Sequence, residues 1–437
     1  MKLQKENITD KQRKKLYRQA IASQTLGMQG MLAFGNGILL LYMTALGISP
    51  ARIITYLALP IAISVILRLP VAYKLDQIGF KKFGTLGAFL TSVGFSIIPI
   101  AGFFPTKQAE MVILLGISIL AIGKTLFAPT WLPILDSFVN PDERGKFFSK
   151  LMLSIQFLGL CVSGLTAWYI RSTPGGETPI YKYMIVLSFL ALCLFGRFYF
   201  YSKIPEIESK EKKKNNSGFL KSIREILSNG DFISFCLYIF MLLLFTAGCV
   251  NLFALVEKNV MNLDGSYIIL LANTTTVGAL VGLFIGGKVI DRYGSRYVFL
   301  FCHLAFVCTI ALFLLRNQFF MPIVAVALAH FSLGLIASFS GLARSTEILA
   351  LIPAQNKSLS TSVAVCLTLG AQSLSGLISA LAISSNLINP NWTLLGDSMS
   401  SFDGILLIYG VMTFLLIVTL GLVPSVLRKS TWSAMPN

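Results

Sequence analysis

The chain has 437 residues, of which 55% are hydrophobic and 13% are charged. Soluble domains carry about 25% charged residues, so this composition excludes an ordinary soluble protein and is typical of one that crosses a membrane many times. The formal net charge of +17 could serve a nucleic acid or a membrane, and the positions of the basic residues decide between them.

Apolar runs long enough to cross a bilayer recur along the whole chain. The hydrocarbon core is about 30 Å thick and needs roughly 20 apolar residues per helix. An even number of crossings brings both termini to the same side. We expect twelve spans, near residues 22–46, 51–73, 83–104, 110–138, 147–170, 181–202, 232–256, 266–287, 297–315, 319–341, 359–384 and 403–424.

Basic residues are distributed unevenly between the two sides of these spans. About 27 of the 36 Lys and Arg lie on the side of the N-terminus and about 6 on the other. Since Lys and Arg accumulate in cytoplasmic loops, we expect a multi-pass protein of the cell (inner) membrane with both termini in the cytoplasm. The lipid bilayer accounts for the basic charge, so we expect no nucleic-acid partner, and we expect a monomer.

One long hydrophilic stretch divides the chain into two halves. At the N-terminus, Thr9 and Gln12 have the spacing of a capping box for a short helix. After Ser217, apolar residues at helical spacing predict an amphipathic helix on the membrane surface. We expect a basic cytoplasmic arm (1–21), a six-helix bundle (22–202), a cytoplasmic linker with the amphipathic helix (203–230), a second six-helix bundle (231–424) and a cytoplasmic tail (425–437).

Polar side chains inside the spans of the first half mark candidate substrate contacts. Gln29 and Asn36 are seven residues apart and share one helical face, where hydrogen bonding between helices explains them as well as substrate contact does. Arg68, near the cytoplasmic end of the second span, either extends to the interface or faces a cavity. Gln156 lies on a polar face of the fifth span. Arg197, at the end of the sixth, is expected to extend to the interface.

Lys124 is the most informative residue of the first half. It lies about 14 residues from either end of the fourth span, which is roughly 20 Å of helix and beyond the reach of a lysine side chain. Exposure to lipid would cost at least ~2.5–3.5 kcal/mol. No Asp or Glu lies at comparable depth in any expected span, so we expect Lys124 in a central hydrated cavity. A lysine solvated by carbonyls and water, or held neutral, is the alternative.

The second half offers further polar residues at membrane depth. Asn251, Asn273 and Gln372 are candidates for substrate contact, and His330 either packs through hydrogen bonds or takes part in substrate or proton coupling. In the eighth span, glycines recur at every fourth position. We expect that strip to pack against the fifth helix across a pseudo-symmetry axis; it consists of Gly278, Gly282 and Gly286.

Nothing in the sequence indicates a metal or a cofactor. The seven cysteines all fall in the expected spans, and neither they nor the two histidines have the spacing of metal ligands. We expect free thiols, no metal and no cofactor. The first apolar run is too long for a cleavable signal peptide.

A charged turn between the eighth and ninth spans carries a family resemblance. Its residues resemble the Gly-x-x-x-Asp-Arg-x-Gly-x-Arg signature of the major facilitator superfamily of secondary transporters, with matches at Gly287, Asp291, Arg292, Gly294 and Arg296. A weaker copy lies 215 residues earlier and keeps Asp76, Gly79 and Lys81. The resemblance implies an all-α membrane protein with twelve transmembrane helices in two pseudo-symmetric six-helix bundles.

The same resemblance implies a latch on the cytoplasmic side. The turn after the fourth span resembles the family's Pro-x-x-Arg-Gly pattern at Pro141, Arg144 and Gly145. We expect Asp291 to face the start of the fifth helix near Arg144, and Asp76 to face the start of the eleventh. Asp136 is expected to join the first of these contacts.

These features predict a secondary active transporter that works by alternating access between the two bundles. A buried cation without a matching buried acid favours a small organic anion as substrate, with a proton or a sodium ion as the coupling partner in symport. Stripes of Asn, Gln, Ser and Thr leave a sugar or polyol as the alternative. A channel and an integral-membrane enzyme are the other classes, and no motif of a known enzyme chemistry is present, so we expect no enzyme.

Overall fold

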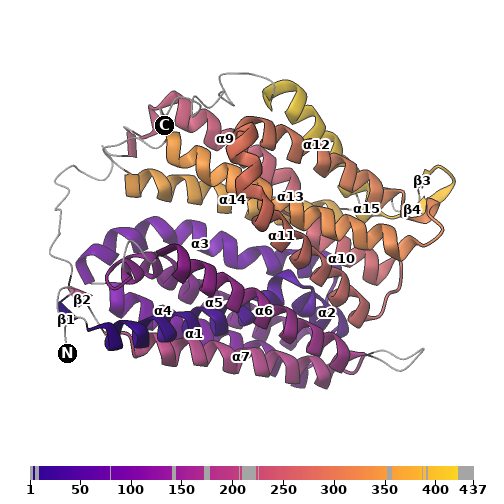
Figure 1. The fold of residues 1–437 in the computed structure, drawn as a ribbon. Helices are drawn as coiled ribbons and strands as arrows, with labels where there is room; N and C mark the ends of the chain where they lie inside the picture. Colours follow the sequence, from indigo (N-terminus) through magenta and orange to yellow (C-terminus); the bar gives the residue numbers. More distant parts are fainter. Residues whose placement is uncertain are drawn as a thin grey trace. The chain divides into compact units, whose positions relative to one another are not determined.

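The computed structural model is almost entirely helical (Figure 1). It describes residues 3–4, 9–78, 80–139, 144–171, 178–205, 207–208, 223–224, 226–351, 357–385, 387–389 and 392–421.

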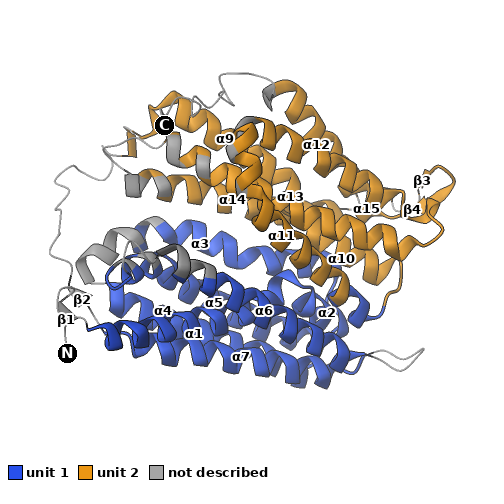
Figure 2. Cartoon of the chain, viewed as in Figure 1, with its two compact units in different colours: residues 1–214, 264–269 blue, residues 215–263, 270–437 orange. Residues whose placement is uncertain are grey.

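Two compact units divide the chain (Figure 2). The first holds residues 1–214 and 264–269, and the second holds residues 215–263 and 270–437. Most of the expected linker lies outside the described residues. Of the segment expected as an amphipathic helix, residues 223–224 and 226–227 are described and helical, with Ile226 buried and Leu227 exposed.

The first unit is built from long helices with a minimal strand pair. Strands β1 (Leu3–Gln4) and β2 (Ile207–Glu208) pair in parallel. The helical elements are α1 (Asp10–Gly35), α2 (Ile38–Ala45), α3 (Pro50–Ile78), α4 (Phe80–Ile97), the 3-10 turn η2 (Ile98–Phe103), α5 (Thr106–Asp136), α6 (Arg144–Ile170) and α7 (Ile180–Ser202).

The second unit repeats this pattern with a hairpin near its end, and residues 265–269 at the start of its helix α11 are grouped with the first unit. Strands β3 (Trp392–Leu394) and β4 (Asp397–Met399) pair antiparallel. The helical elements are α9 (Gly230–Thr246), α10 (Cys249–Asn259), α11 (Gly265–Tyr293), α12 (Ser295–Leu314), the 3-10 turn η4 (Arg316–Gln318), α13 (Pro322–Leu351), α14 (Lys357–Ser384), α15 (Ser401–Leu416) and the π-helical turn η6 (Ile417–Gly421).

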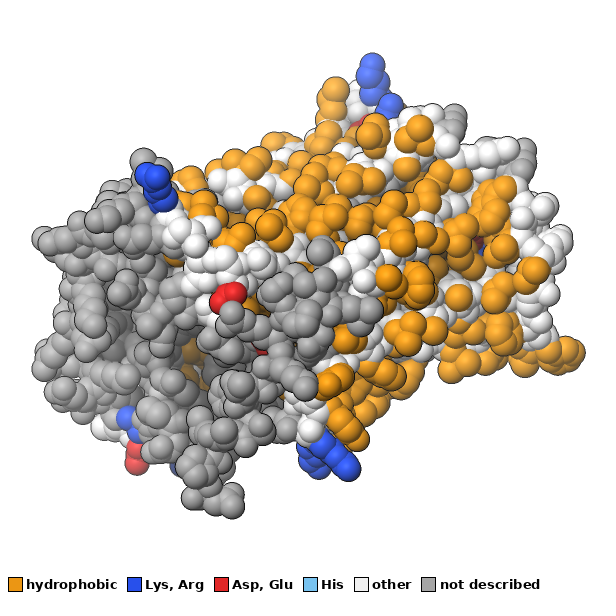
Figure 3. Space-filling view, turned by 90° about the horizontal axis from the view of Figure 1, so that it is seen from above, with side chains coloured by type: hydrophobic (Ala, Val, Ile, Leu, Met, Phe, Trp, Pro, Cys, Tyr) orange, Lys and Arg blue, Asp and Glu red, His pale blue; other side chains and the backbone are white. Residues whose placement is uncertain are grey.

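The expected membrane spans appear as helices. Among the described residues, eleven helical segments are long and apolar enough to cross a bilayer. The pair α1 and α2, bent by 51° at the break between them, supplies a twelfth when it is counted as one span. Apolar side chains cover much of the surface in view, as a lipid-facing exterior requires (Figure 3). The all-α membrane fold is confirmed.

The N-terminal capping box is present, but the helix that it opens is long. Thr9 and Gln12 cap each other as predicted, and α1 then continues into the first span as far as Gly35. Asn36 caps its end, and Gly37 next to it takes a φ of 81° that glycine adopts without steric cost, so the span bends before α2 begins. The predicted glycine turn of the charged loop is also formed, because Gly294 precedes α12 with a φ of 80°.

Glycines set how closely helices approach within the first unit. A Cβ on Gly94 of α4 would lie 2.3 Å from the Leu120 nitrogen of α5, and one on Gly123 of α5 would lie 2.4 Å from the Thr91 nitrogen of α4. The two backbones therefore touch, as small residues allow in membrane helices. This contact fixes one side of α5.

The glycine strip of α11 packs against a different helix from the one predicted. A Cβ on Gly278 would lie 2.0 Å from the Phe331 carbonyl oxygen of α13, and one on Gly282 would lie 2.8 Å from that of Leu335. In return, a Cβ on Gly334 of α13 would lie 1.9 Å from the Thr275 carbonyl oxygen of α11. The prediction that this strip packs against the fifth helix was wrong, because the spacing of glycines identifies a close-packing face but not the helix that covers it.

Candidate functional site

Lys124 is an exposed side chain on a long apolar helix. The large exposed apolar side chains of α5 near it are Leu115 and Ile122. At 3.6 residues per turn, Lys124 is rotated from them by about 180° and about 200°. Its ammonium group therefore leaves the helix on the side opposite to these large apolar side chains, and the exposed apolar neighbour on its own side is the small Ala128. Within the described residues, no hydrogen bond or ion pair reaches its Nζ.

The helices α3 and α5 hold two cations next to each other. Thr125 donates from Oγ1 to the Oγ of Ser64 across a distance of 2.9 Å. Lys124 directly precedes Thr125, and Arg68 follows Ser64 by one helical turn. The charges of Arg68 and of Arg197 both act on Lys124. The first unit thus gathers three basic side chains from α3, α5 and α7.

Arg197 does not extend to the interface as expected. It is buried with an exposed fraction of 6%, and its Nη2 donates to Oε1 of Gln24 on α1 at 2.7 Å. Its guanidinium lies 3.8 Å from the ring centroid of Phe127 on α5, and Gly27 gives it room. The aromatic face and the missing Cβ hold this cation inside the bundle, which hydropathy alone cannot reveal. Its buried Nε has no hydrogen-bond partner among the residues that the structure describes.

The amides of the first span are used mainly for helix packing. Gln29 is fully buried and donates from Nε2 to the carbonyl oxygens of Thr25 and, at 3.5 Å, of Ile155 on α6. Asn36 reaches Oγ of Ser163 on α6 at 3.4 Å. Gln156 remains half-buried on α6.

In the second unit, His330 stands in a buried polar chain across three helices. Its Nε2 lies 2.6 Å from Oε1 of Glu257 on α10, and its Nδ1 lies 2.8 Å from Oγ1 of Thr275 on α11. The Glu257 and His330 side chains are at most 2% exposed. Sequence reasoning missed Glu257, because the expected span ended one residue before it, whereas α10 continues to Asn259.

The other polar candidates of the second unit are half-buried: Asn251, Asn273 and Gln372. Further along α14, two serines that follow Gln372 on the same helix form hydrogen bonds with residues outside it. Ser375 accepts from the Gly248 nitrogen at 3.0 Å, and Ser379 lies 2.8 Å from the Tyr409 hydroxyl.

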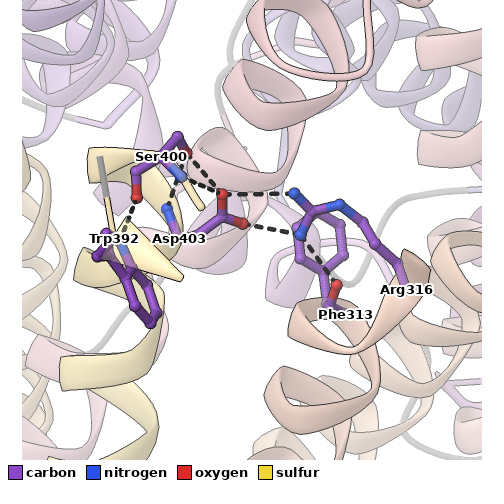
Figure 4. A network of polar contacts seen from close by, with 5 residues as sticks. All are labelled: Phe313, Arg316, Trp392, Ser400 and Asp403. Carbon is purple, nitrogen blue, oxygen red and sulfur yellow. Dashed lines mark hydrogen bonds and ion pairs between the residues drawn. The ribbon is translucent and has the colours of Figure 1, made fainter. Parts of the chain in front are cut away.

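A second buried charge pair escaped the sequence analysis. Arg316 of η4 donates from Nη1 to Oδ1 of Asp403 on α15 at 2.8 Å, and from Nη2 to Oδ2 at 3.3 Å (Figure 4). Asp403 also accepts from the nitrogen and hydroxyl of Ser400 and so closes a capping box at the start of α15. The pair joins two helices of one unit and is structural.

Some of the expected latch residues can be placed. Lys81 of α4 donates to the carbonyl oxygen of Tyr201 near the end of α7, so it has a partner inside its own unit. Arg292 is exposed and lies over the Tyr293 ring. The whole of Gly79 lies outside the described residues, as do the side chains of five others: Asp76, Asp136, Arg144, Asp291 and Arg296. Gly287 is described only as part of the α11 backbone.

Comparisons with known proteins agree with this architecture. By sequence, the multidrug resistance protein MdtH of Blochmanniella pennsylvanica (strain BPEN) is 24% identical over 168 residues. The match spans 38% of this chain and only 36% of the relative, about a third of its length.

Solved structures match over nearly the whole chain. A point mutant of the nucleoside transporter NupG has a TM-score of 0.71 at 14% identity, over 92% of this chain and 98% of the other. A D-xylose–proton symporter has a TM-score of 0.70 at 15% identity, over 95% and 99%. At such identities these likenesses concern the fold.

The family of the chain can be assigned from its sequence. The family model of the Major Facilitator Superfamily matches residues 23–371, which is most of the chain. Members of this family are transporters and not enzymes. The chain therefore belongs to the Major Facilitator Superfamily, a family of transporters, and is a multi-pass membrane protein.

Proposed function

We propose that this transporter moves a small organic anion by alternating access, and that Lys124 binds the negative charge of the substrate. The supporting observation is an exposed ammonium group on the side of α5 away from its large exposed apolar side chains, Leu115 and Ile122. A charged lysine at this depth would cost ~2.5–3.5 kcal/mol or more in lipid, so it requires water or an anion. A bound carboxylate or phosphate supplies the missing counter-charge.

The neighbouring cations favour an anionic over a cationic substrate. Arg68 and Arg197 lie close enough to Lys124 for their positive charges to repel its ammonium group. A cluster of three basic side chains attracts anions and repels cations, and both effects are stronger where water is scarce. Arg197 is held in place by Gln24 and Phe127, so it contributes a fixed positive field.

Two other substrate classes are less well supported. The sugar or polyol alternative was based on polar side chains along the expected spans. Of these, Gln29 and Asn36 form hydrogen bonds between α1 and α6. A broad drug range is suggested by the similarity to MdtH, a multidrug resistance protein. Cationic drugs would face the repulsion of Lys124, so this candidate extends only to neutral or acidic compounds.

The orientation in the membrane is also a proposal. The excess of Lys and Arg on the segments of the N-terminal side supports cytoplasmic termini in the cell (inner) membrane. A fluorescent reporter that folds only in the cytoplasm, fused after Asn437, should be fluorescent. A dark fusion together with an active periplasmic reporter at the same position would reverse the assignment.

A ligand screen with matched variants tests the anion proposal. Purified protein is heated with millimolar succinate, citrate, inorganic phosphate, glucose or xylitol, and the melting temperature is recorded. A ligand at 100 times its Kd stabilises the folded state by about 2.7 kcal/mol. We expect at least one anion to raise the melting temperature of the wild type.

The variants assign this effect to Lys124. Lys124→Ala should lose the stabilisation by the anion, whereas Lys107→Ala, which removes an exposed lysine in the first turn of the same helix, should keep it. Uptake of the same radiolabelled anion into proteoliposomes should follow the same order. The proposal is rejected when the anion stabilises Lys124→Ala as strongly as the wild type, or when only the neutral compounds stabilise the protein.

A further inference from the structure

The helices α4 and α7 of the first unit pack against each other from end to end. Near the start of α4, a Cβ on Gly84 would lie 1.8 Å from the hydroxyl oxygen of Tyr201, which is close to the end of α7. Beyond the other end of α4, in the turn η2, a Cβ on Gly102 would lie 2.5 Å from the sulfur of Met184, near the start of α7. The two helices are therefore antiparallel neighbours.

Exposed side chains follow both helices along this contact. On α7 they recur at steps of 4, 3, 4 and 4 residues, which is the spacing of one helical face: Ser188, Leu192, Phe195, Tyr199 and Lys203. On α4 they recur at steps of 4 and 3 residues: Lys82, Leu86 and Phe89. We call the surface between these two rows the α4–α7 groove. Because the helices are antiparallel, both rows have a lysine at the same end and apolar side chains beyond it.

A cavity of about 240 Å³ opens from the apolar part of the α4–α7 groove; its lining residues are Ser96, Pro99, Ser188, Ala191, Leu192 and Phe195. The regular helix α4 ends at Ile97 and gives way to the 3-10 turn that contains Pro99, while the side chain of Ala191 on α7 is small. The Ser96 hydroxyl donates to the carbonyl oxygen of Ser92 at 2.8 Å, so it is satisfied within its own helix. An unfilled hollow loses van der Waals contacts, so hydrocarbon is favoured inside it.

The lysines at the other end of the α4–α7 groove are held against aromatic rings. Lys203 donates to the hydroxyl of Tyr199, and its Nζ lies 3.9 Å from the centroid of that ring. Lys81, which precedes Lys82, donates to the carbonyl oxygen of Tyr201, and its Nζ lies 4.6 Å from that ring centroid. The helices α4 and α7 and the turn η2 contain no Asp or Glu. These helices therefore present positive charge that they do not neutralise themselves.

The cavity lies within the depth of one membrane leaflet. From the headgroups to the midplane a leaflet measures about 20 Å, which is half of the full bilayer thickness. On α7, Phe195 at the near wall of the cavity precedes Lys203 by eight residues, roughly 12 Å of helix. On α4, Ser96 follows Lys82 by 14 residues, roughly 21 Å. A lipid chain whose headgroup lies at the lysines therefore reaches the cavity.

We propose that the α4–α7 groove binds one anionic phospholipid of the leaflet on the side of the two termini. Lys82 and Lys203 bind its phosphate, and one acyl chain follows the apolar rows and ends in the cavity. Basic sites between membrane helices favour anionic headgroups, and the orientation proposed above makes this leaflet the cytoplasmic one, where such lipids are found. The groove contains no residue of α5, so this site does not rest on the anion proposal for Lys124.

Lipid binding to the purified protein tests this site without any transport substrate. The protein is freed of lipid in a neutral detergent and mixed with dioleoyl phosphatidylglycerol, dioleoyl phosphatidylcholine or glycerol 3-phosphate, and native mass spectrometry counts the bound molecules. We expect one phosphatidylglycerol to bind at least about tenfold more tightly than phosphatidylcholine, because only the former has a net negative headgroup. We expect glycerol 3-phosphate, which lacks acyl chains, to bind far more weakly.

Two results of this comparison would overturn the proposal. Equal affinity for phosphatidylglycerol and phosphatidylcholine would mean that the groove holds ordinary boundary lipid. Equal affinity for phosphatidylglycerol and glycerol 3-phosphate would mean that the lysines bind a free phosphate and that the cavity holds no chain.

A pair of double variants tests the headgroup end. Lys82→Ala combined with Lys203→Ala should weaken the binding of phosphatidylglycerol by about tenfold or more, which is the order of magnitude expected for two lysines at an anionic headgroup. Both side chains are exposed, so the fold should be retained, and the melting temperature in detergent checks this. Lys107→Ala combined with Lys182→Ala removes two lysines at the opposite end of α5 and α7 and should leave binding unchanged. Equal losses in the two double variants would reject the assigned position.

A filled cavity tests the acyl-chain end. Ser188 is an exposed lining residue, so Ser188→Phe places a ring in the cavity without disturbing the core, and it should weaken the binding of phosphatidylglycerol. Leu165→Phe, at an exposed position of α6 outside the groove, is the matched control and should bind like the wild type. Undiminished binding by Ser188→Phe would show that no chain enters the cavity and would refute the proposal.

Discussion

The buried pair of Arg316 and Asp403 permits a quantitative test of what holds the second unit together. The substitution Asp403→Asn keeps the shape of the side chain and its capability to cap α15, but it removes the negative charge. Arg316 is 1% exposed, so its guanidinium cannot turn to water. The remaining carbonyl oxygen of Phe313, at 3.1 Å from Nη1, offers only a neutral acceptor.

The expected cost follows from general measurements on such pairs. Breaking a buried ion pair by removing one partner destabilises a protein by about 3–5 kcal/mol, because the other charge stays buried and uncompensated. For units of 150–250 residues, each kcal/mol shifts the melting temperature by about 2–4 °C. Asp403→Asn should therefore lower the melting temperature by about 6–20 °C in detergent or nanodiscs.

The double variant gives the decisive comparison. In Asp403→Asn combined with Arg316→Met, no buried charge remains, and the apolar side chain packs on the Phe313 ring that the guanidinium now covers. We expect the double variant to be more stable than Asp403→Asn alone, with a coupling of a few kcal/mol. Additive losses in the two single variants would refute the reasoning, since they would mean that the two charges do not stabilise each other.

Two glycine predictions follow from the close approaches and the backbone. Gly334→Ala should lower the melting temperature because a Cβ would lie 1.9 Å from the Thr275 carbonyl oxygen, whereas Gly341→Ala on the same helix meets open space and should be neutral or stabilising; equal effects of the two would contradict the assigned contact between α11 and α13. Gly37→Val should be less stable than Gly37→Asn, because the φ of 81° is left-handed and Asn tolerates it better; the thermal unfolding of both variants decides this.

Hydropathy and local motifs predicted the elements of the fold well. Long apolar runs have few structural options in a membrane, so the spans could be read from composition. The capping box at Thr9 and the glycine at Gly294 were predictable for the same reason, because each depends only on residues within one turn. Local chemistry sufficed where only neighbours in the sequence take part.

Partners between helices were not predictable from one sequence. Gly278 shows the limit, since its spacing revealed a packing face but not that α13 covers it. Gln29 shows it again, because a polar face on a membrane helix is equally consistent with a substrate and with the carbonyl of Ile155 on α6. A period of 3.6 gives direction around one axis and nothing about the neighbour that lies there.

The missed acids have a common physical cause. A span drawn by hydropathy stops at the first charged residue, so Glu257 was assigned to a loop and Asp403 to a span boundary. In the structure each lies inside helical packing because a basic or imidazole partner accompanies it. His330 was the available signal: a mid-span histidine without a known partner should prompt a search for a carboxylate near the ends of neighbouring spans.

The two units differ in how their buried charged groups are partnered. In the first unit, no carboxylate bonds to the ammonium group of Lys124 among the described residues, and a bound anion is the partner that we propose for it. In the second, Glu257 lies against His330, and Asp403 lies against Arg316. A charge that is paired within the protein needs no ligand, whereas an unpaired ammonium group favours an anionic one. The shared turn motif therefore predicts the fold of each half but not its chemistry.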